Sequence, residues 1–241
     1  DNRAVDTFAG KTIKLANDID ISSIAEWRPI GGNVTYTTTE ENPDYTKIDI
    51  IIEDAKTFQG TFDGCTHSIK GLKITKKDAK YGAFFVATKD ATIQNINFSE
   101  VNMCLDESKL LATDKGCDYA TVVGIAKNTQ LKDITVGGSI CSTRVAGIAY
   151  VVTDGTKLTN CVSSLALTSN RRTYSKIDNS GTRAVEMNVI SGGLVGQVAI
   201  ENATTIDKKA TDEKELFLNC KFNGTLTVEN STGTPSMIWV G

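Results

Sequence analysis

The feature that most constrains the fold of this chain is a six-residue pattern with apolar residues at its first, fourth and sixth positions. Five copies begin at residues 69, 93, 131, 158 and 217, and only Ser163 departs from the apolar rule. The third position is always Gly, Asn or Asp, and it is occupied by Gly71, Asn95, Asp133, Asn160 and Asn219. A pattern that recurs in this way predicts a repeated structural unit.

The chemistry of the third position indicates what the unit looks like. A plain strand alternates its side chains with period two, so positions one, four and six share a face only if the chain bends at position three. Gly, Asn and Asp are the residue types that most readily adopt a left-handed backbone conformation. Each copy therefore predicts a strand, a one-residue corner and a second strand, and we expect the five corner residues to lie in one vertical file.

Short apolar strands that contain glycine alternate with the corner patterns. Gly124 and Gly147 are 23 residues apart, whereas polar insertions lengthen the other intervals. A spacing of this size is typical of a repeat unit whose copies stack on one another. We therefore predict an all-β chain folded as a parallel β-helix, with about three short strands per coil and with loop insertions. The alternative is a β-sandwich of antiparallel hairpins, which does not account for the repeated corner.

These motifs resemble those of the GLUG-motif right-handed parallel β-helix proteins. The Gly-Leu-Val-Gly sequence at 193–196 is the nearest match, and segments 8–21, 27–31 and 58–69 are similar to the start of such helices. In three other copies Phe85, Ala126 and Ala149 replace the final glycine. The resemblance implies an exported bacterial protein, secreted or held at the cell surface, with an adhesive or supporting role and no catalytic activity.

The resemblance covers nearly all of the chain outside the insertions, so we expect one β-helix domain over residues 1–241. Residues 1–68 are predicted to form an N-terminal cap and the first coils. Residues 69–241 are predicted to form GLUG-type coils with insertions at 105–116, 170–188 and 200–215. Because the sequence stops inside a glycine-type strand at 238–241, we also expect further chain or a partner at the C-terminal coil.

Composition argues against two classes of partner. The formal net charge is -3, which provides no basic surface for nucleic acid. No apolar run approaches the roughly 20 residues that span a bilayer, so direct membrane insertion is not expected. No targeting segment opens the sequence, and the extracellular or cell-surface location therefore rests on the resemblance alone.

The sequence offers no convincing catalytic or metal-binding group. His67 is the only histidine, and Asp18, Asp20 and Asp63 have turn-like surroundings that favour turn and cap roles. The predicted outward positions of the corner strands carry no carboxylate, whereas a carbohydrate-active enzyme needs a converging pair. We therefore predict no catalytic residue, no metal and no cofactor.

The six cysteines include no CxxC pair that would indicate zinc or thiol redox chemistry. Cys161 and Cys220 occupy the same inward repeat position and are expected to be buried thiols, as is Cys141. Cys104 and Cys117 flank the insertion 105–116. In an exported protein they are candidates for a disulfide across its base, with two separate thiols as the alternative.

Binding residues are expected in the insertions, because loops on a rigid scaffold commonly carry function. The insertions 105–116 and 170–188 leave the same corner and should project from one edge, with a groove between them. The predicted ligand is a host or environmental glycan or protein, bound through stacking and hydrogen bonds of Arg171, Arg172, Tyr174 and Arg183. The alternatives are solvated loops without a role, a carbohydrate-active β-helix enzyme such as a polysaccharide lyase or glycoside hydrolase, and a structural stalk or spacer.

Overall fold

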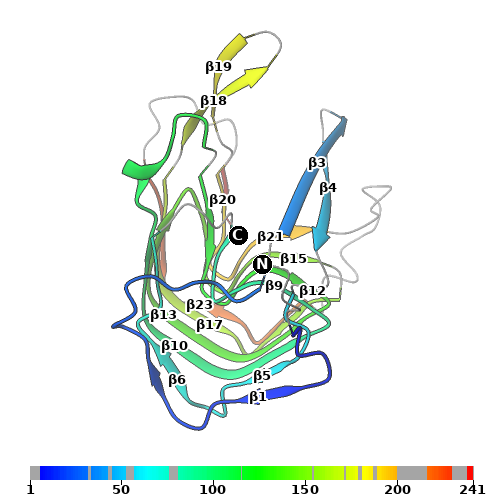
Figure 1. Cartoon of the computed structure of the whole chain (residues 1–241), viewed down its shortest axis with the longest axis vertical. Coiled ribbons are helices and arrows are strands. Elements are labelled where there is room, and N and C mark those ends of the chain that lie inside the picture. Colours follow the sequence, from blue (N-terminus) through cyan, green and yellow to red (C-terminus); the bar gives the residue numbers. More distant parts are fainter. Residues whose placement is uncertain are drawn as a thin grey trace.

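The computed structural model shows that nearly all regular secondary structure in the described residues is β-strand (Figure 1). Among the described residues one short 3-10 turn, η2 (Glu107–Lys109), is the helical exception. The structure describes residues 6–31, 34–42, 45–52, 57–75, 81–114, 116–153, 155–170, 172–178, 181–186, 189–199, 216–229 and 238–240. The predicted insertion 200–215 lies outside them.

The largest sheet has twelve strands, and all its strand pairs are parallel. Its central strands are long because the strand segments before and after the corner residue form one continuous strand. The strands are β1 (Thr12–Lys14), β2 (Ile19–Asp20), β5 (Thr61–Asp63), β6 (Ser68–Lys70), β7 (Lys73–Ile74), β10 (Thr92–Cys104), β13 (Gln130–Ser142), β16 (Lys157–Thr159), β17 (Val162–Asn170), β22 (Phe217–Leu218), β23 (Lys221–Phe222) and β24 (Thr225–Glu229).

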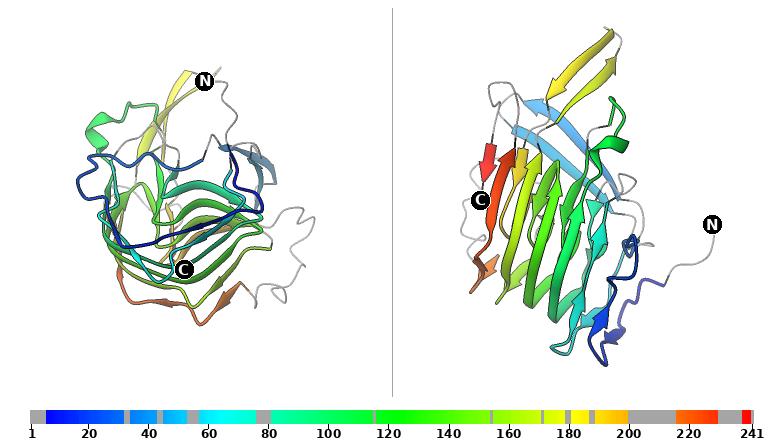
Figure 2. Two further views of the ribbon diagram at one scale, coloured as in Figure 1. Left: turned by 60° about the horizontal axis from the view of Figure 1, so that its bottom comes forward. Right: turned by 90° about the vertical axis from the view of Figure 1, so that its left-hand side faces the viewer.

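After each strand segment of the large sheet, the chain continues into two smaller parallel sheets. The three-stranded sheet contains β8 (Tyr81–Gly82), β11 (Asp118–Ala120) and β14 (Arg144–Ala146). The four-stranded sheet contains β9 (Phe85–Lys89), β12 (Val123–Lys127), β15 (Ala149–Thr153) and β21 (Val195–Ala199). The chain visits the large, three-stranded and four-stranded sheets in this order and then returns to the large sheet, and we call one such circuit a pass. Figure 2 shows the strands of successive passes side by side.

The remaining strands form three two-stranded sheets. Antiparallel hairpins join β3 (Val34–Asn42) to β4 (Tyr45–Ile52) and β18 (Thr173–Asp178) to β19 (Gly181–Glu186). Strand β20 (Val189–Ser191) pairs in parallel with β25 (Ile238–Val240). Because antiparallel pairing in the described residues is confined to the two hairpins, the alternative of an antiparallel β-sandwich is wrong.

Four of the corner residues stack in consecutive passes, and each has a left-handed backbone with φ between 51° and 53°. The strand register places Asn95 beside Asp133, Asp133 beside Asn160 and Asn160 beside Asn219. Side-chain hydrogen bonds also join residues of neighbouring passes along this stack. Asn160 Nδ2 donates to Asp133 Oδ1 at 2.8 Å, and Asn95 Nδ2 donates to Asp63 Oδ1 at 3.0 Å. We call the file from Asn95 to Asn219, together with Asp63 bonded to its first member, the corner ladder.

Gly71 lies at a different bend, which corrects the predicted file of five. The pairs Lys70 with Ser99 and Lys73 with Asn102 place Gly71 beside Glu100. Both have positive φ, 80° for Gly71 and 50° for Glu100. In that pass the first corner is made by Cys65 and Thr66, with φ of 50° and 68°. The six-residue pattern at 69–74 therefore begins one bend later than the other copies.

A second file of left-handed residues forms where the four-stranded sheet returns to the large sheet. Asp90, Asn128 and Gly155 have φ of 51°, 44° and 80°. Asn128 Nδ2 donates to Asp90 Oδ1 at 2.6 Å. Each residue precedes a corner-ladder residue by five positions, so the sequence contains a second regular signal besides the six-residue pattern.

Apolar side chains fill the space that the three sheets enclose. Ile93, Leu131 and Leu158 stack in register there with no exposed surface. A smaller apolar cluster contains Tyr81 and Tyr150 and involves strands of the three- and four-stranded sheets. A Cβ at Gly196 would lie 2.7 Å from the Tyr150 ring, so the glycine lets an aromatic ring pack directly on the backbone.

Candidate functional site

The hairpin β18–β19 projects beyond the sheets at the junction between the large and three-stranded sheets (Figure 1). The segment 105–114 leaves the same junction two passes earlier, after β10 and before β11. In the pass between them, the chain crosses this junction directly from β13 to β14. We call the hairpin and the segment 105–114 together the projecting edge.

Hydrogen bonds join the two parts of the projecting edge. The Ser175 backbone N–H donates to the Ala112 carbonyl at 2.7 Å. Arg172 donates from Nη2 to the Leu111 carbonyl at 2.7 Å and from Nε to the Asp114 carbonyl at 2.9 Å. The two insertions thus contact each other directly at this point, and the Arg172 guanidinium acts as a cross-link between them.

The segment 105–114 is itself held in shape by side chains. Asp106 caps η2 and accepts a hydrogen bond from the Ser108 backbone N–H at 3.2 Å. Asp114 Oδ2 accepts from the Leu111 backbone N–H at 2.8 Å, which closes a turn. An aspartate that bonds to nearby backbone N–H groups stabilises a turn in this way. The carbonyls that accept hydrogen bonds from Arg172 therefore belong to a structured loop.

Two other predicted binding residues, Tyr174 and Arg183, lie on the hairpin strands. Register pairs Tyr174 with Val185 and Lys176 with Arg183. Directly paired positions, and positions two apart along a strand, share a face of a two-stranded ribbon. Tyr174, Lys176 and Arg183 therefore occupy positions on one hairpin face, whereas Arg171 lies outside the described residues.

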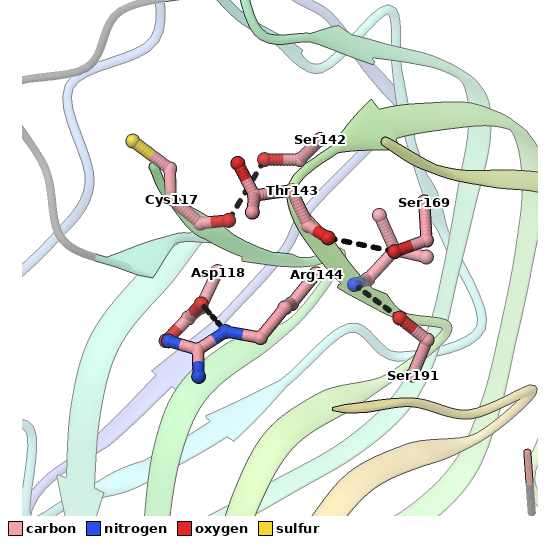
Figure 3. A network of polar contacts seen from close by, with 8 residues as sticks. Cys117, Asp118, Ser142, Thr143, Arg144, Ser169 and Ser191 are labelled. Atoms are coloured by element: carbon pink, nitrogen blue, oxygen red, sulfur yellow. Dashed lines mark hydrogen bonds and ion pairs between the residues drawn. The ribbon is translucent and has the colours of Figure 1, made fainter. Parts of the chain in front are cut away.

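A deeply buried ion pair joins Arg144 of β14 to Asp118 of β11 (Figure 3). The guanidinium donates from Nε to Oδ1 at 2.6 Å and from Nη2 to Oδ2 at 2.8 Å. The exposed fraction of the side chain is 20% for Arg144 and 3% for Asp118. Arg144 also lies 5.6 Å from the centre of the Tyr150 ring, within range of a cation–π contact.

The environment keeps Arg144 charged. Burial acts to lower the pKa of its guanidinium, but the Asp118 carboxylate and the neighbouring Tyr150 outweigh burial and raise the pKa. A bidentate arginine–carboxylate pair is a strong, geometrically specific contact. Asp118 is thereby engaged with a permanent cation, which does not favour a role as a general base.

Hydroxyl groups around this ion pair hold the short connection from β13 to β14 (Figure 3). Ser142 Oγ donates to the Cys117 carbonyl at 2.9 Å, and Ser169 Oγ donates to the Thr143 carbonyl at 2.6 Å. The Val145 backbone N–H donates to Ser191 Oγ at 3.1 Å. These bonds satisfy most of the buried polar groups here, as burial requires, whereas the buried Thr143 hydroxyl has no hydrogen-bond partner.

The pair of Arg144 and Asp118 was not predicted from the sequence, although the sequence contains a signal for it. Each charged residue begins a strand whose next two residues are fully buried. They are 26 residues apart, close to the spacing of the bare repeat. Opposite charges at equivalent positions of neighbouring repeats indicate a contact between passes.

The remaining sequence candidates have structural contacts. Asp18 Oδ1 accepts from the Ser68 backbone N–H at 2.8 Å and lies 3.3 Å from His67 Nδ1, and Asp20 accepts from the Ser22 backbone N–H at 2.9 Å. Asp63 accepts from the Cys65 backbone N–H and from the side chains of Asn95 and Gln94. Within the described part of the chain, no group of three or more His, Cys, Asp or Glu side chains is placed to hold a metal ion.

Asp63 gives the corner ladder a pH dependence. Burial acts to raise the pKa of its carboxyl group, but the hydrogen bonds from Cys65, Asn95 and Gln94 outweigh burial and lower the pKa. The carboxylate therefore stabilises the fold above the unfolded pKa of about 3.9, and this contribution disappears as the pH falls through the lower, folded pKa.

We expect Asp63→Asn to destabilise the protein at pH 7, because an amide cannot accept all of these hydrogen bonds. Urea unfolding between pH 7 and pH 2.5 measures the difference from the natural sequence. The difference should be largest above about pH 5 and should shrink below about pH 4. A difference independent of pH would show that the charge of Asp63 does not matter.

The structure places Cys104 and Cys117 as thiols without a disulfide between them. Cys104 is exposed at the end of β10, whereas Cys117 is buried just before β11. Register instead pairs Cys104 with Cys141 of β13. Cys161 is fully buried, and Cys220 lies partly buried in the next pass.

Comparison with known proteins adds no relative: no family model matches the chain, and neither the curated proteins nor the solved structures contain a match. In the part of the chain that the structure describes, no helix is both long and apolar enough to cross a bilayer.

Proposed function

We propose that the chain is a right-handed parallel β-helix that serves as a non-enzymatic binding module of an exported bacterial protein. The parallel sheets and the stacked corner ladder support the β-helix. The proposed ligand is a glycan or protein of the host or of the environment. The projecting edge is its proposed binding surface. The export and the adhesive role rest on the resemblance to GLUG-motif proteins.

One observation carries the proposal. The two insertions that leave the same junction are tied together by Arg172 and by the bond from Ser175 to Ala112. A preorganised loop pair loses less conformational entropy on binding than two independent loops. The hairpin adds Tyr174, Lys176 and Arg183 on one face, and aromatic and cationic groups of this kind bind glycans and acidic peptides.

The test is a glycan and mucin binding array with the purified chain, followed by titration of any ligand found. Tyr174→Ala and Arg183→Ala should each weaken binding by about tenfold or more, as loss of a central contact does. Lys132→Ala provides the matched control, because Lys132 is an exposed cation on the large sheet, away from the projecting edge.

Two outcomes would contradict the proposal. Binding that is unchanged in Tyr174→Ala and Arg183→Ala would move the site away from the projecting edge. Absence of any ligand on the array would favour the stalk or spacer. Cleavage of a polysaccharide during the assay would instead support the carbohydrate-active enzyme, which requires two carboxylates placed about a nanometre apart or less.

A further inference from the structure

Cys104 and Cys141 lie side by side on neighbouring strands at the base of the projecting edge. They are direct partners in the register of β10 and β13. Met103 and Ile140, the residues before them, are fully buried, so the alternation of a strand turns both cysteines to the outer face. Cys104 is exposed and Cys141 is partly exposed.

The spacing of the strands suits a covalent link. Directly paired residues of neighbouring strands are separated by about 4.7–4.9 Å, which falls within the Cα separation of roughly 4.4–6.8 Å found for disulfides. Asn170 of the next pass donates from Nδ2 to Cys141 Sγ at 3.4 Å and holds that sulfur in place. Cys104 ends its strand, where the backbone has more freedom to adjust.

The other stacked cysteines do not offer the same chemistry. Cys161 is fully buried, and its Sγ donates to the Leu131 carbonyl at 3.3 Å. Cys220 Sγ donates to the Leu158 carbonyl at 3.4 Å. An oxidant in solution reaches exposed thiols first, because reactivity follows access as well as thiolate content.

We propose that Cys104 and Cys141 are the site of a reversible disulfide that links two neighbouring passes. Oxidised glutathione, or another small disulfide, is the oxidant. The Cys104 thiolate attacks one sulfur of the oxidant and releases one thiolate. The Cys141 thiolate then attacks Cys104 Sγ and releases the second thiol, so that two cysteines lose two protons and two electrons while one disulfide becomes two thiols.

We expect the second step to be the slower one. Burial, followed by the neighbouring Cys104, raises the pKa of the Cys141 thiol to about 12. Only a small fraction of Cys141 is thiolate at neutral pH, so ring closure is slow and accelerates as the pH rises. Closure joins the pass that carries the segment 105–114 to the next pass, directly below the projecting edge. This cross-link is independent of the proposed binding function.

The experiment treats the reduced, full chain with oxidised glutathione at pH 8 and digests it without reduction for mass spectrometry. We expect a peptide pair that joins Cys104 to Cys141, with a mass two hydrogen atoms below that of the separate peptides. The oxidised protein should melt about 5 °C higher than the reduced protein, because the link restricts the unfolded chain. Dithiothreitol should reverse both changes.

Cys104→Ser is the main variant because this exposed position tolerates serine, and it should abolish both the linked peptide and the gain in Tm. Cys220→Ser is the matched control and should retain them. A glutathione adduct that persists on Cys104 without closure would overturn the proposal. A linked peptide that joins Cys104 to Cys117 would overturn it too.

Discussion

Replacing Gly138 with alanine is expected to destabilise the protein by about 3 kcal/mol or more. Gly138 has φ of 130°, a conformation that side-chain-bearing residues rarely adopt. A Cβ there would lie 2.2 Å from the carbonyl oxygen and 2.5 Å from the backbone nitrogen of Val101. These atoms belong to the neighbouring strand β10, so they cannot move aside as a flexible side chain can.

The preceding glycine provides a matched control. A Cβ at Gly137 would meet nothing within 4 Å. Gly137→Ala should therefore change the free energy of unfolding by less than about 0.5 kcal/mol, with a small gain from the stiffer unfolded chain. Urea unfolding at pH 7 compares the two variants. Equal effects would mean that β10 and β13 do not approach each other closely at Val101.

Replacing Arg144 with methionine is expected to cost about 3 kcal/mol and to lower Tm by about 10 °C. The change removes a bidentate guanidinium from a carboxylate that is only 3% exposed. A buried charge that loses its ion-pair partner is much more costly than the intact pair is stabilising. Thermal unfolding followed by circular dichroism measures the effect.

A double variant separates the charge from the packing. Arg144→Met combined with Asp118→Leu removes both charges and should recover most of the stability, because apolar pairs commonly replace buried ion pairs well. Asp118→Leu alone should be destabilising, since it leaves the guanidinium largely buried. If the double variant were as unstable as the sum of the single variants, the ion pair would not be the cause of the loss.

The corner residues could be predicted because the pattern reflects a local requirement of the backbone. Asn95, Asp133, Asn160 and Asn219 each need a left-handed conformation so that the apolar residue that follows turns inward. The order of strands likewise predicted that the insertions 105–116 and 170–188 would leave the same edge. Parallel pairing then follows, because each repeat returns to the same place in the next pass.

The contacts between passes could not be predicted, because they depend on register. Strand β10 carries one residue more than β13 at the second bend, where Glu100 has φ of 50°. Cys104 therefore follows Asn95 by nine residues, whereas Cys141 follows Asp133 by eight. Because of this difference, the sequence spacing alone does not show that Cys104 and Cys141 are paired in the strand register. The sequence predicts ligand binding for Arg172 from its place in an insertion, whereas its contacts with the Leu111 and Asp114 carbonyls could not be predicted because the shape of that loop is not evident from sequence.

The junction at the projecting edge also shows where residues can be inserted or deleted during evolution. The crossing from β13 to β14 needs few residues, whereas the next pass places a whole hairpin at the same point. The strands on either side keep their pairing in both cases. Insertions of different length at this junction therefore leave the strand pairing of the sheets unchanged, so the number of residues here can vary at little cost to folding.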